Sequence, residues 1–191
     1  MARWEPDSRD RLRQAALDLY GERGFEHTTV AEIAKRAGLT ERTFFRHFAD
    51  KREVLFAGSE ALEERLVRTV AEAPSSLAPL DAVGVGLEAL GAVLPERAET
   101  SRVRQAIITA NAELQERELI KLASLSAALA GALRDRGLGD AAASLTAEVG
   151  IAVFKTAFER WIDGAETRDF AHVVRESIGE LKALSVSSGS P

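Results

Sequence analysis

A short run of polar and cationic side chains between residues 40 and 48 carries the most specific chemistry of the sequence. Their hydroxyl, guanidinium and imidazole groups can hydrogen-bond the edges of bases and the oxygens of phosphates. The residues concerned are Thr40, Arg42, Thr43, Arg46 and His47. On a helix, Phe44 and Phe48 would lie on the opposite side, facing a core. The pattern therefore predicts a helix that reads a DNA groove with one face and packs inward with the other.

Two short helices joined by a glycine turn would position this helix. Thr29 and Glu32 have the spacing of a capping box, in which each side chain satisfies the other residue's backbone at the start of a helix. That helix is expected to end at Gly38, because glycine adopts the left-handed conformation of a sharp turn, and Thr40 can cap the helix that follows. The spacing predicts a helix-turn-helix from Thr29 to Phe48.

Apolar residues at helical spacing can close a small core between these two helices and a first helix that runs from Ser8 to Gly24. The core positions of the two helices are Val30, Ile33, Ala34, Leu39, Phe44 and Phe48, and those of the first helix are Leu12, Ala15, Ala16 and Leu19. Residues Asp50 to Glu53 form another capping-box-like start and predict a long fourth helix toward Val70.

The whole chain of 191 residues reads at helical period, without the alternation of a half-buried strand, so the predicted class is all-α with about nine helices. Breaks in the pattern predict further helices over 81–94, 100–111, 113–136, 140–163 and 167–184. We expect a three-helix DNA-binding domain over 1–56, a helical effector-binding and dimerisation domain over 57–184, reached through the long fourth helix, and a disordered tail over 185–191.

Net charge alone does not favour DNA binding, because the chain carries a formal charge of -5. Up to Phe56, however, 11 Lys and Arg residues face 10 Asp and Glu residues, net +1, whereas the remainder holds 14 and 20, net -6. Phosphate attraction depends on local cations, and a distant acidic body is screened by salt. The charge distribution therefore permits DNA binding without requiring it.

Several other classes of protein are disfavoured. The chain has no cysteine, which fits a reducing cytoplasm, and we expect no membrane-spanning segment and no signal peptide. His27, His47 and His172 are scattered, and no metalloprotease, serine-hydrolase or phosphate-loop motif is present. We expect no catalytic residue, no metal and no cofactor, and a cytoplasmic protein that is not an enzyme.

The run Thr43-Phe44-Phe45-Arg46-His47-Phe48, together with the capped helix before it, resembles the tetracycline-repressor (TetR) family over Arg11 to Phe56. The resemblance implies a homodimeric transcription regulator that binds a palindromic operator. It further implies a ligand-responsive body, and repression is favoured because a dimer on a promoter blocks polymerase by occupancy. The remaining chain agrees with the family only in length and helical character.

The resemblance also implies roles for single residues. Thr29 and Lys51 match phosphate-contacting positions at the starts of the second and fourth helices. Arg42, Thr43, Arg46 and His47 match positions that face bases or backbone, and Glu41 beside them could accept a hydrogen bond from cytosine. For His47 a structural role is an equal alternative. Phe45 departs from the usual tyrosine, so a hydroxyl contact to phosphate is lost, although its ring can pack against a sugar.

Specific binding would need two heads about 34 to 36 Å apart, and therefore a dimer. The last two helices are the expected interface, as the resemblance also implies, and would form a four-helix bundle with their counterparts. Their apolar stripes are Leu145, Val149, Ala152, Val153 and Trp161 on one helix and Phe170, Val173, Val174, Ile178, Leu181 and Leu184 on the other. The alternative is that these stripes pack only within one chain.

The resemblance also implies a small-molecule pocket between the central helices, whose occupant changes the spacing of the heads. Phe154, Phe158 and Trp161 could line its apolar wall, although a place in the core is the favoured alternative for all three. Arg102, Gln105 and Asn111 could supply polar groups. The alternative function is a helical small-molecule binder or adaptor that does not bind DNA.

Overall fold

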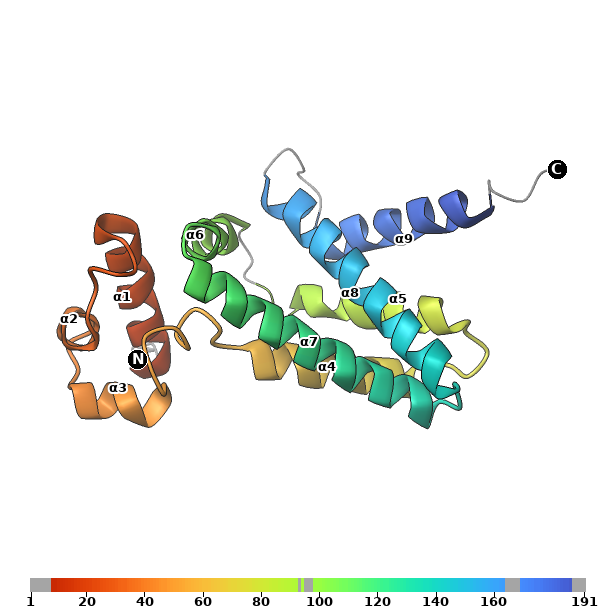
Figure 1. The fold of residues 1–191 in the computed structure, drawn as a ribbon, viewed down its shortest axis with the longest axis horizontal. Coiled ribbons are helices and arrows are strands. Elements are labelled where there is room, and N and C mark those ends of the chain that lie inside the picture. The colour runs from red at the N-terminus through yellow and green to blue at the C-terminus, as the bar shows by residue number, and fades with distance from the viewer. Residues whose placement is uncertain (1–7, 93, 95–97, 164–168, 187–191) are drawn as a thin grey trace, which may run out of the picture. The chain divides into compact units, whose positions relative to one another are not determined.

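The computed structural model describes residues 8–92, 94, 98–163 and 169–186, and all regular structure within them is helical. This confirms the predicted all-α class. The helices are α1 (Ser8–Arg23), α2 (Val30–Arg36), α3 (Glu41–His47), α4 (Ser59–Glu72), α5 (Pro79–Ala89), the short 3-10 helix η1 (Leu90–Ala92), α6 (Ala98–Thr109), α7 (Ala112–Asp135), α8 (Asp140–Ile162) and α9 (Phe170–Val186) (Figure 1).

The helices form two compact units. The first, called the head here, comprises the chain up to Gly58 together with Thr100–Glu118, and the second, called the body, comprises Ser59–Glu99 and the chain from Leu119 onward. The head is larger than the predicted 1–56, because α6 and the first turns of α7 belong to it. Ile107, Ile108 and Leu114 are buried in the same apolar cluster as α1 and α3.

The predicted start of the fourth helix at Asp50 is wrong. The Asp50 carboxylate does accept hydrogen bonds from the backbone N–H groups of Arg52 (2.8 Å) and Glu53 (3.2 Å), as the capping pattern suggests. Turns then follow instead of a helix, and α4 begins only at Ser59, after Gly58 with a φ of 95°. The local capping signal was therefore correct, and the helix was not.

Three consecutive buried residues explain this difference. Val54, Leu55 and Phe56 are all buried. Successive residues of an α-helix point about 100° apart, so three in a row cannot share one inward face. The turns, closed by bonds such as Leu55 N–H to the Arg52 carbonyl (3.0 Å), bring all three side chains into the core of the head.

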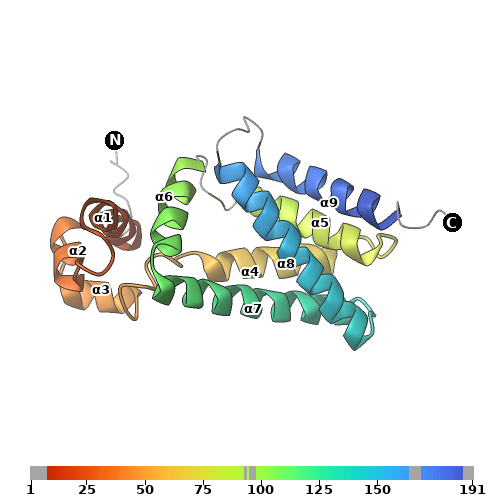
Figure 2. The same cartoon turned by 45° about the horizontal axis from the view of Figure 1, so that its top comes forward.

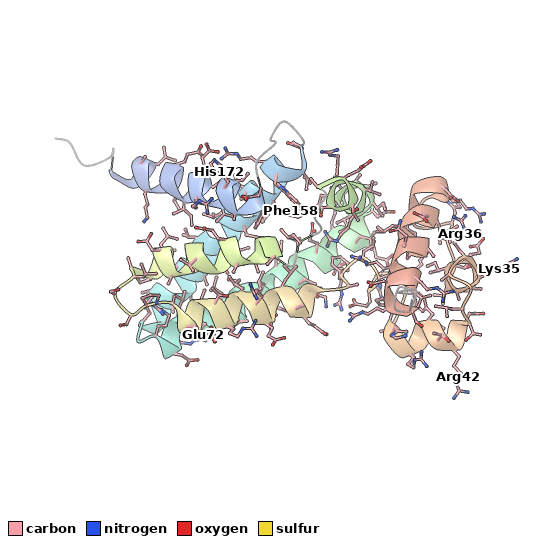
Figure 3. The ribbon with its side chains drawn as sticks, turned by 180° about the vertical axis from the view of Figure 1, so that it is seen from behind. Lys35, Arg36, Arg42, Glu72, Phe158 and His172 are labelled. Atoms are coloured by element: carbon pink, nitrogen blue, oxygen red, sulfur yellow. The ribbon has the colours of Figure 1, made fainter. Side chains whose placement is uncertain are left out.

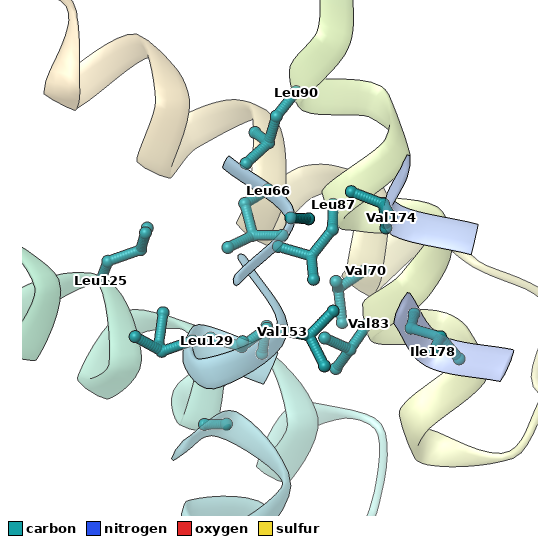
Figure 4. Packing of buried hydrophobic residues seen from close by; sticks show 14 of the residues in the cluster. Leu66, Val70, Val83, Leu87, Leu90, Leu125, Leu129, Val153, Val174 and Ile178 are labelled. Atoms are coloured by element: carbon teal, nitrogen blue, oxygen red, sulfur yellow. The ribbon is translucent and has the colours of Figure 1, made fainter. Parts of the chain in front are cut away.

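Helix α5 is the centre of the body, where it packs against α4, α8 and α9 (Figure 2). Apolar side chains from these helices and from α7 converge on it, and Figure 4 shows Leu66, Val83, Leu129, Val153 and Ile178 among them. The contact is close because glycines on α5 and α8 leave room for neighbouring side chains. These are Gly84 beside Ile178, Gly86 beside Leu66 and Val70, and Gly150 beside Val83.

Helix α8 is long and apolar enough to meet the length and composition of a membrane span, with 23 residues and a mean hydropathy of 1.3. The expectation that no segment would reach this threshold is therefore not met. A core helix of a globular protein passes the same test. Ala147, Ile151 and Ala157 of α8 are buried in the apolar cluster of the body, and 33% of its apolar stretch is buried in all, so the core accounts for part of its composition.

At the carboxyl end, α9 extends to Val186, two residues beyond the predicted end of the last helix. The predicted disordered tail begins at residue 185, and its residues 187–191 lie outside the described part of the chain.

The close approach of α4 and α5 can be tested at Gly86. A Cβ atom at this position would lie 2.6 Å from Cγ2 of Val70 and 2.8 Å from Cδ1 of Leu66. We expect Gly86→Ala to lower the free energy of unfolding by about 1 to 3 kcal/mol through overpacking. Denaturant unfolding followed by circular dichroism measures this change.

The matched control is Gly21→Ala in α1, where a Cβ atom would meet nothing within 4 Å. Its expected effect is an increase of up to about 1 kcal/mol, because alanine favours helix over glycine. Equal stability of wild type and Gly86→Ala would show that α4 and α5 do not pack this closely.

Candidate nucleic-acid interface

The amino end of α2 is closed by Thr29 and Glu32, as predicted. The Thr29 hydroxyl accepts from the Glu32 N–H (3.3 Å), and the Glu32 carboxylate accepts from the Thr29 N–H (2.9 Å) and hydroxyl (2.9 Å). These hydrogen bonds, first that from the Thr29 backbone and then that from its hydroxyl, lower the pKa of Glu32. Thr29 is exposed, so the amino end of α2 faces solvent, although both donors of Thr29 itself are given to Glu32.

The turn between α2 and α3 is held by hydrogen bonds of Gly38 and of the residues before and after it. Its φ of 67° lets the Leu39 N–H reach the Ala34 carbonyl (2.8 Å), while the Gly38 N–H reaches that of Lys35 (3.0 Å), which is a Schellman ending. The Arg11 guanidinium donates to the carbonyl of Ala37, the cap residue (2.5 Å). The sequence analysis found the glycine but missed Arg11, because no local pattern links residues 26 positions apart.

Helix α3 begins at the predicted cap. The Thr40 hydroxyl accepts from the Thr43 N–H (3.2 Å), and the two hydroxyls are 3.0 Å apart. Phe44 is fully buried, and its ring lies 5.6 Å from that of Phe48. The predicted core is confirmed at its four buried members, Ile33, Ala34, Phe44 and Phe48, while Val30 and Leu39 are only partly buried against it.

The outer side of α3 is exposed at Glu41, Arg42, Phe45 and Arg46. Figure 3 shows the Arg42 side chain extending away from its helix, and it has no hydrogen bond or ion pair with the described residues. The Phe45 ring is 56% exposed although it is apolar. The helix therefore has a buried face with Phe44 and an exposed face with two arginines and the Phe45 ring. The sequence predicts this division.

His47 lies at the boundary of these two faces. Its ring is half-buried and 6.5 Å from that of Phe48, while its Nε2 lies 3.4 Å from Nη2 of Arg46. Both roles considered for this histidine, support of the core and proximity to DNA, fit this position.

Helix α2 carries two further exposed cations, Lys35 and Arg36. Arg36 is held by Glu22 of α1 in a bidentate pair (2.7 and 2.9 Å), which ties α2 to α1. Lys35 extends into solvent beside it and has no partner among the described residues (Figure 3). The sequence analysis did not single out Lys35, because a single lysine at the end of a helix is typical of any solvated surface.

Lys51 is engaged inside the head. Its ammonium donates to the carbonyls of Phe25 (2.8 Å), Thr28 (3.0 Å) and Glu26 (3.3 Å), and it lies 4.3 Å above the Phe25 ring. An ammonium group has three donors, and all three are used. This geometry argues against the phosphate contact implied by the resemblance, and assigns Lys51 to holding the loop after α1.

The six residues expected at an effector site lie in two different units. Arg102 and Gln105 on α6 and Asn111 after it belong to the head, where Gln105 bonds Glu118 (3.1 Å) and Asn111 bonds the Ile107 carbonyl (2.6 Å). Phe154, Phe158 and Trp161 belong to the body. The six therefore do not line one wall within a single unit.

The three aromatic residues of α8 form a cluster with Phe170 of α9. The rings of Phe154 and Phe158 are stacked at 5.9 Å, and Trp161 lies 5.8 Å from Phe170. Trp161 and Phe170 are buried, whereas Phe154 and Phe158 are half-buried. Of the three aromatic residues of α8, Trp161 therefore lies in the core, as the alternative prediction had it.

The predicted dimer stripes on α8 and α9 are divided between the core and the surface. Six of the eleven side chains are buried within the chain itself: Val153, Trp161, Phe170, Val173, Val174 and Ile178. Leu145 and Leu184 are 67% and 72% exposed, Ala152 is also exposed, and Val149 and Leu181 are half-buried. The alternative that the stripes pack within one chain therefore holds for most of their members, and an apolar surface remains.

The role of Lys51 can be tested by Lys51→Met. Loss of three hydrogen bonds from a charged donor should lower the free energy of unfolding by roughly 1.5 to 3 kcal/mol. Thermal and denaturant unfolding measure this, with Arg42→Met as the matched control, because a partnerless surface cation should change stability by less than about 0.5 kcal/mol. Wild-type stability of Lys51→Met, combined with a weaker salt dependence of DNA binding, would restore the phosphate contact.

Comparison with known proteins agrees with this geometry. Residues 12–57 match the family described as bacterial regulatory proteins, tetR family, and residues 77–184 match the MftR C-terminal domain. The HTH-type transcriptional regulator TcmR of Streptomyces glaucescens is 39% identical over 83 residues, which are 44% of this chain and 37% of that protein. The repressor Rv3405c of Mycobacterium tuberculosis is 36% identical over 83 residues, 44% of this chain and 42% of that protein.

Solved structures agree in fold over nearly the whole chain. The complex of SmeT with triclosan superposes with a TM-score of 0.66 at 22% identity, covering 94% of this chain and 91% of that one. A regulator from Aquifex aeolicus gives 0.57 at 18% identity, covering 93% and 99%. The aligned segments of the curated regulators are short, spanning less than half of each, whereas the two family matches together extend from Leu12 to Leu184. The chain belongs to the tetR family of bacterial regulatory proteins.

Proposed function

We propose that this protein is a sequence-specific DNA-binding transcription regulator, a homodimer that represses from a palindromic operator and is released by a small-molecule effector. The observation that carries the proposal is the two-sided helix α3. Its turn is fixed at Gly38, its inner face is anchored by Phe44, and its outer face presents Arg42 and Arg46 to solvent.

The outer face of α3 suits the major groove. Arg42 and Arg46 can each donate two hydrogen bonds to guanine, and Glu41 can accept from cytosine. The hydroxyls of Thr40 and Thr43 are hydrogen-bonded to each other across the first turn, so one of them donates and the other keeps its O–H for a base or a phosphate. The exposed ring of Phe45 can pack against a sugar or a thymine methyl group.

Phosphate contacts would come from α2, the helix that precedes α3. In this structure both donors of Thr29 go to the Glu32 carboxylate, so a phosphate contact by Thr29 requires its hydroxyl to leave Glu32. The remaining N–H groups at the start of α2 can bind an anion, and the partnerless ammonium of Lys35 on the same helix can supply a second contact. In this proposal Lys35 replaces Lys51, whose three donors are used inside the head.

Dimerisation through α8 and α9 is supported by the exposed remainder of their stripes. Leu145 and Leu184 are among the most exposed large apolar side chains of the described residues. Ala141 and Ala152 on α8 and Gly179 on α9 are exposed as well, and small residues allow helices of two chains to approach closely. A four-helix bundle of two such pairs would cover this surface and hold two heads on one operator.

The effector is proposed to bind in the body, at the half-buried rings of Phe154 and Phe158. SmeT, which shares the fold, is described in complex with triclosan. A stacked aromatic pair that is only partly covered offers an apolar wall for such a molecule. We propose no catalytic chemistry for this site, and a cytoplasmic location, where the operator is found.

DNA reading can be tested by Arg46→Ala. We expect it to weaken operator binding by roughly 1 to 3 kcal/mol while the dimer and its melting temperature stay unchanged. The operator is first selected from genomic fragments, and affinity is then measured by gel shift at several salt concentrations. The control Arg68→Ala removes an exposed arginine of α4, outside the head, and should bind like wild type.

Absence of any salt-sensitive shift with wild-type protein would instead favour the alternative, a helical binder that does not contact DNA. Loss of folding in Arg46→Ala would make this arginine structural.

The dimer surface can be tested by Leu145→Glu. A carboxylate at the centre of an apolar interface would lose its hydration without gaining a partner, so the variant should be monomeric. Light scattering after size-exclusion chromatography measures the mass. The control Leu119→Glu replaces a leucine of α7 that is exposed to a similar extent, 61% against 67%, and should stay dimeric. A dimeric Leu145→Glu with a monomeric Leu119→Glu would move the interface to α7.

A further inference from the structure

Seven arginines are half-buried among the described residues, and six of them have a hydrogen-bond acceptor or a carboxylate at ion-pair distance. Arg11 and Arg136 donate to backbone carbonyls, Arg13 and Arg117 each face one carboxylate, Arg160 bridges two, and Arg104 donates to a carbonyl and faces a carboxylate. Arg65 of α4 is the exception. Its Nε is fully buried without a hydrogen-bond partner, and within the described chain it has no ion pair.

The sequence around Arg65 explains why no partner is found on its own helix. Side chains three and four positions away share a helix face, and here they are Ala61, Leu62, Arg68 and Thr69, none of which is a carboxylate. The nearest acid, Glu64, lies on another face and pairs with Arg68 at 3.7 Å. Arg65 is therefore a cation placed where α4 supplies no counter-charge.

This position is costly for the protein alone. A buried N–H without an acceptor loses its hydration and gains nothing in return, whereas an apolar side chain of similar length would pack there without that loss. Leu62, one turn earlier, and Leu66, the next residue, both pack in the apolar cluster of the body. The half-buried Arg65 therefore lies next to the apolar cluster of the body, with Leu62 as its partly exposed neighbour.

We propose that Arg65 binds the anionic group of the effector, and that the effector is an apolar molecule bearing a carboxylate. A guanidinium recognises a carboxylate through two parallel hydrogen bonds, one of which can use Nε. The Nε atom has no accessible surface, so the Arg65 side chain has to turn toward the ligand, which then satisfies the donor that the protein leaves open. The apolar part of the ligand would contact the half-buried Leu62 of α4. This inference rests on the proposed effector regulation and names the chemistry of that ligand.

The test uses the full-length protein and two pairs of probes that differ in head group. Decanoate is compared with decan-1-ol, and 2-naphthoate with naphthalene-2-methanol, in calorimetric titrations. We expect at least one carboxylate to bind wild type at least tenfold more tightly than its neutral partner. Arg65→Met should lose that preference, and Arg65→Lys should keep part of it, because the charge remains while the paired donors are lost.

Arg68→Met is the matched control, because this arginine lies three residues further on α4 and pairs with Glu64 at the surface. It should bind the probes like wild type. Without ligand, Arg65→Met should melt at or above the wild-type temperature, since it removes the open donor. The inference is overturned if neither carboxylate is preferred by wild type, or if Arg65→Met keeps the preference.

Operator binding without probe separates this inference from the proposed function. Arg65→Met should bind the operator like wild type, because Arg65 lies outside the head. Wild-type protein that binds carboxylate but no DNA would refute the regulator and leave the carboxylate site. Wild-type protein that binds DNA but no carboxylate would refute only the site.

Discussion

The hydrogen bond from Arg11 to the Ala37 carbonyl (2.5 Å) joins α1 to the point where α2 ends. The Schellman turn uses the carbonyls of Ala34 and Lys35 and leaves the next two without an intrahelical partner, and a guanidinium from another helix binds that of Ala37. Because Gly38 must hold a positive φ beside that guanidinium, the turn has little freedom. The direction of α3, and with it the position of every outward side chain, depends on this joint.

A second set of polar contacts joins α6 and the start of α7 to the turns after α3, about 50 residues earlier in the chain. The guanidinium of Arg104 on α6 donates to the Leu55 carbonyl (2.6 Å), lies 5.2 Å from the Phe56 ring and faces Glu118 at 3.5 Å. Burial lowers the pKa of Arg104, and the opposing charge of Glu118 acts to raise it. The Arg117–Glu53 pair (2.6 Å) adds to the same contact. Charged groups therefore add to the apolar packing between α6 and the turns after α3.

The sequence was sufficient wherever local rules decide the structure. The capping box at Thr29, the turn at Gly38 and the inward Phe44 follow from spacing alone, and each is present. It was insufficient wherever a distant partner decides. Lys51 looks like a surface cation until the loop after α1 brings three carbonyls to it, and no periodicity indicates that α6 completes the core of the head. The helix expected from Asp50 failed for the same reason, because tertiary burial of three successive residues overrides a local cap.

The shared core of α6 and the first three helices bears on how such regulators can be recombined. The tetR match ends at residue 57, whereas α6 falls within the span of the carboxyl-terminal match, 77–184. A chimera joined between these two spans would combine α1 and α3 of this protein with the residues that a relative has at positions 107, 108 and 114. Those residues would then have to pack against helices with which they did not evolve. Exchange of DNA specificity between relatives therefore has to carry residues 100–118 along with the amino-terminal segment, or redesign that packing.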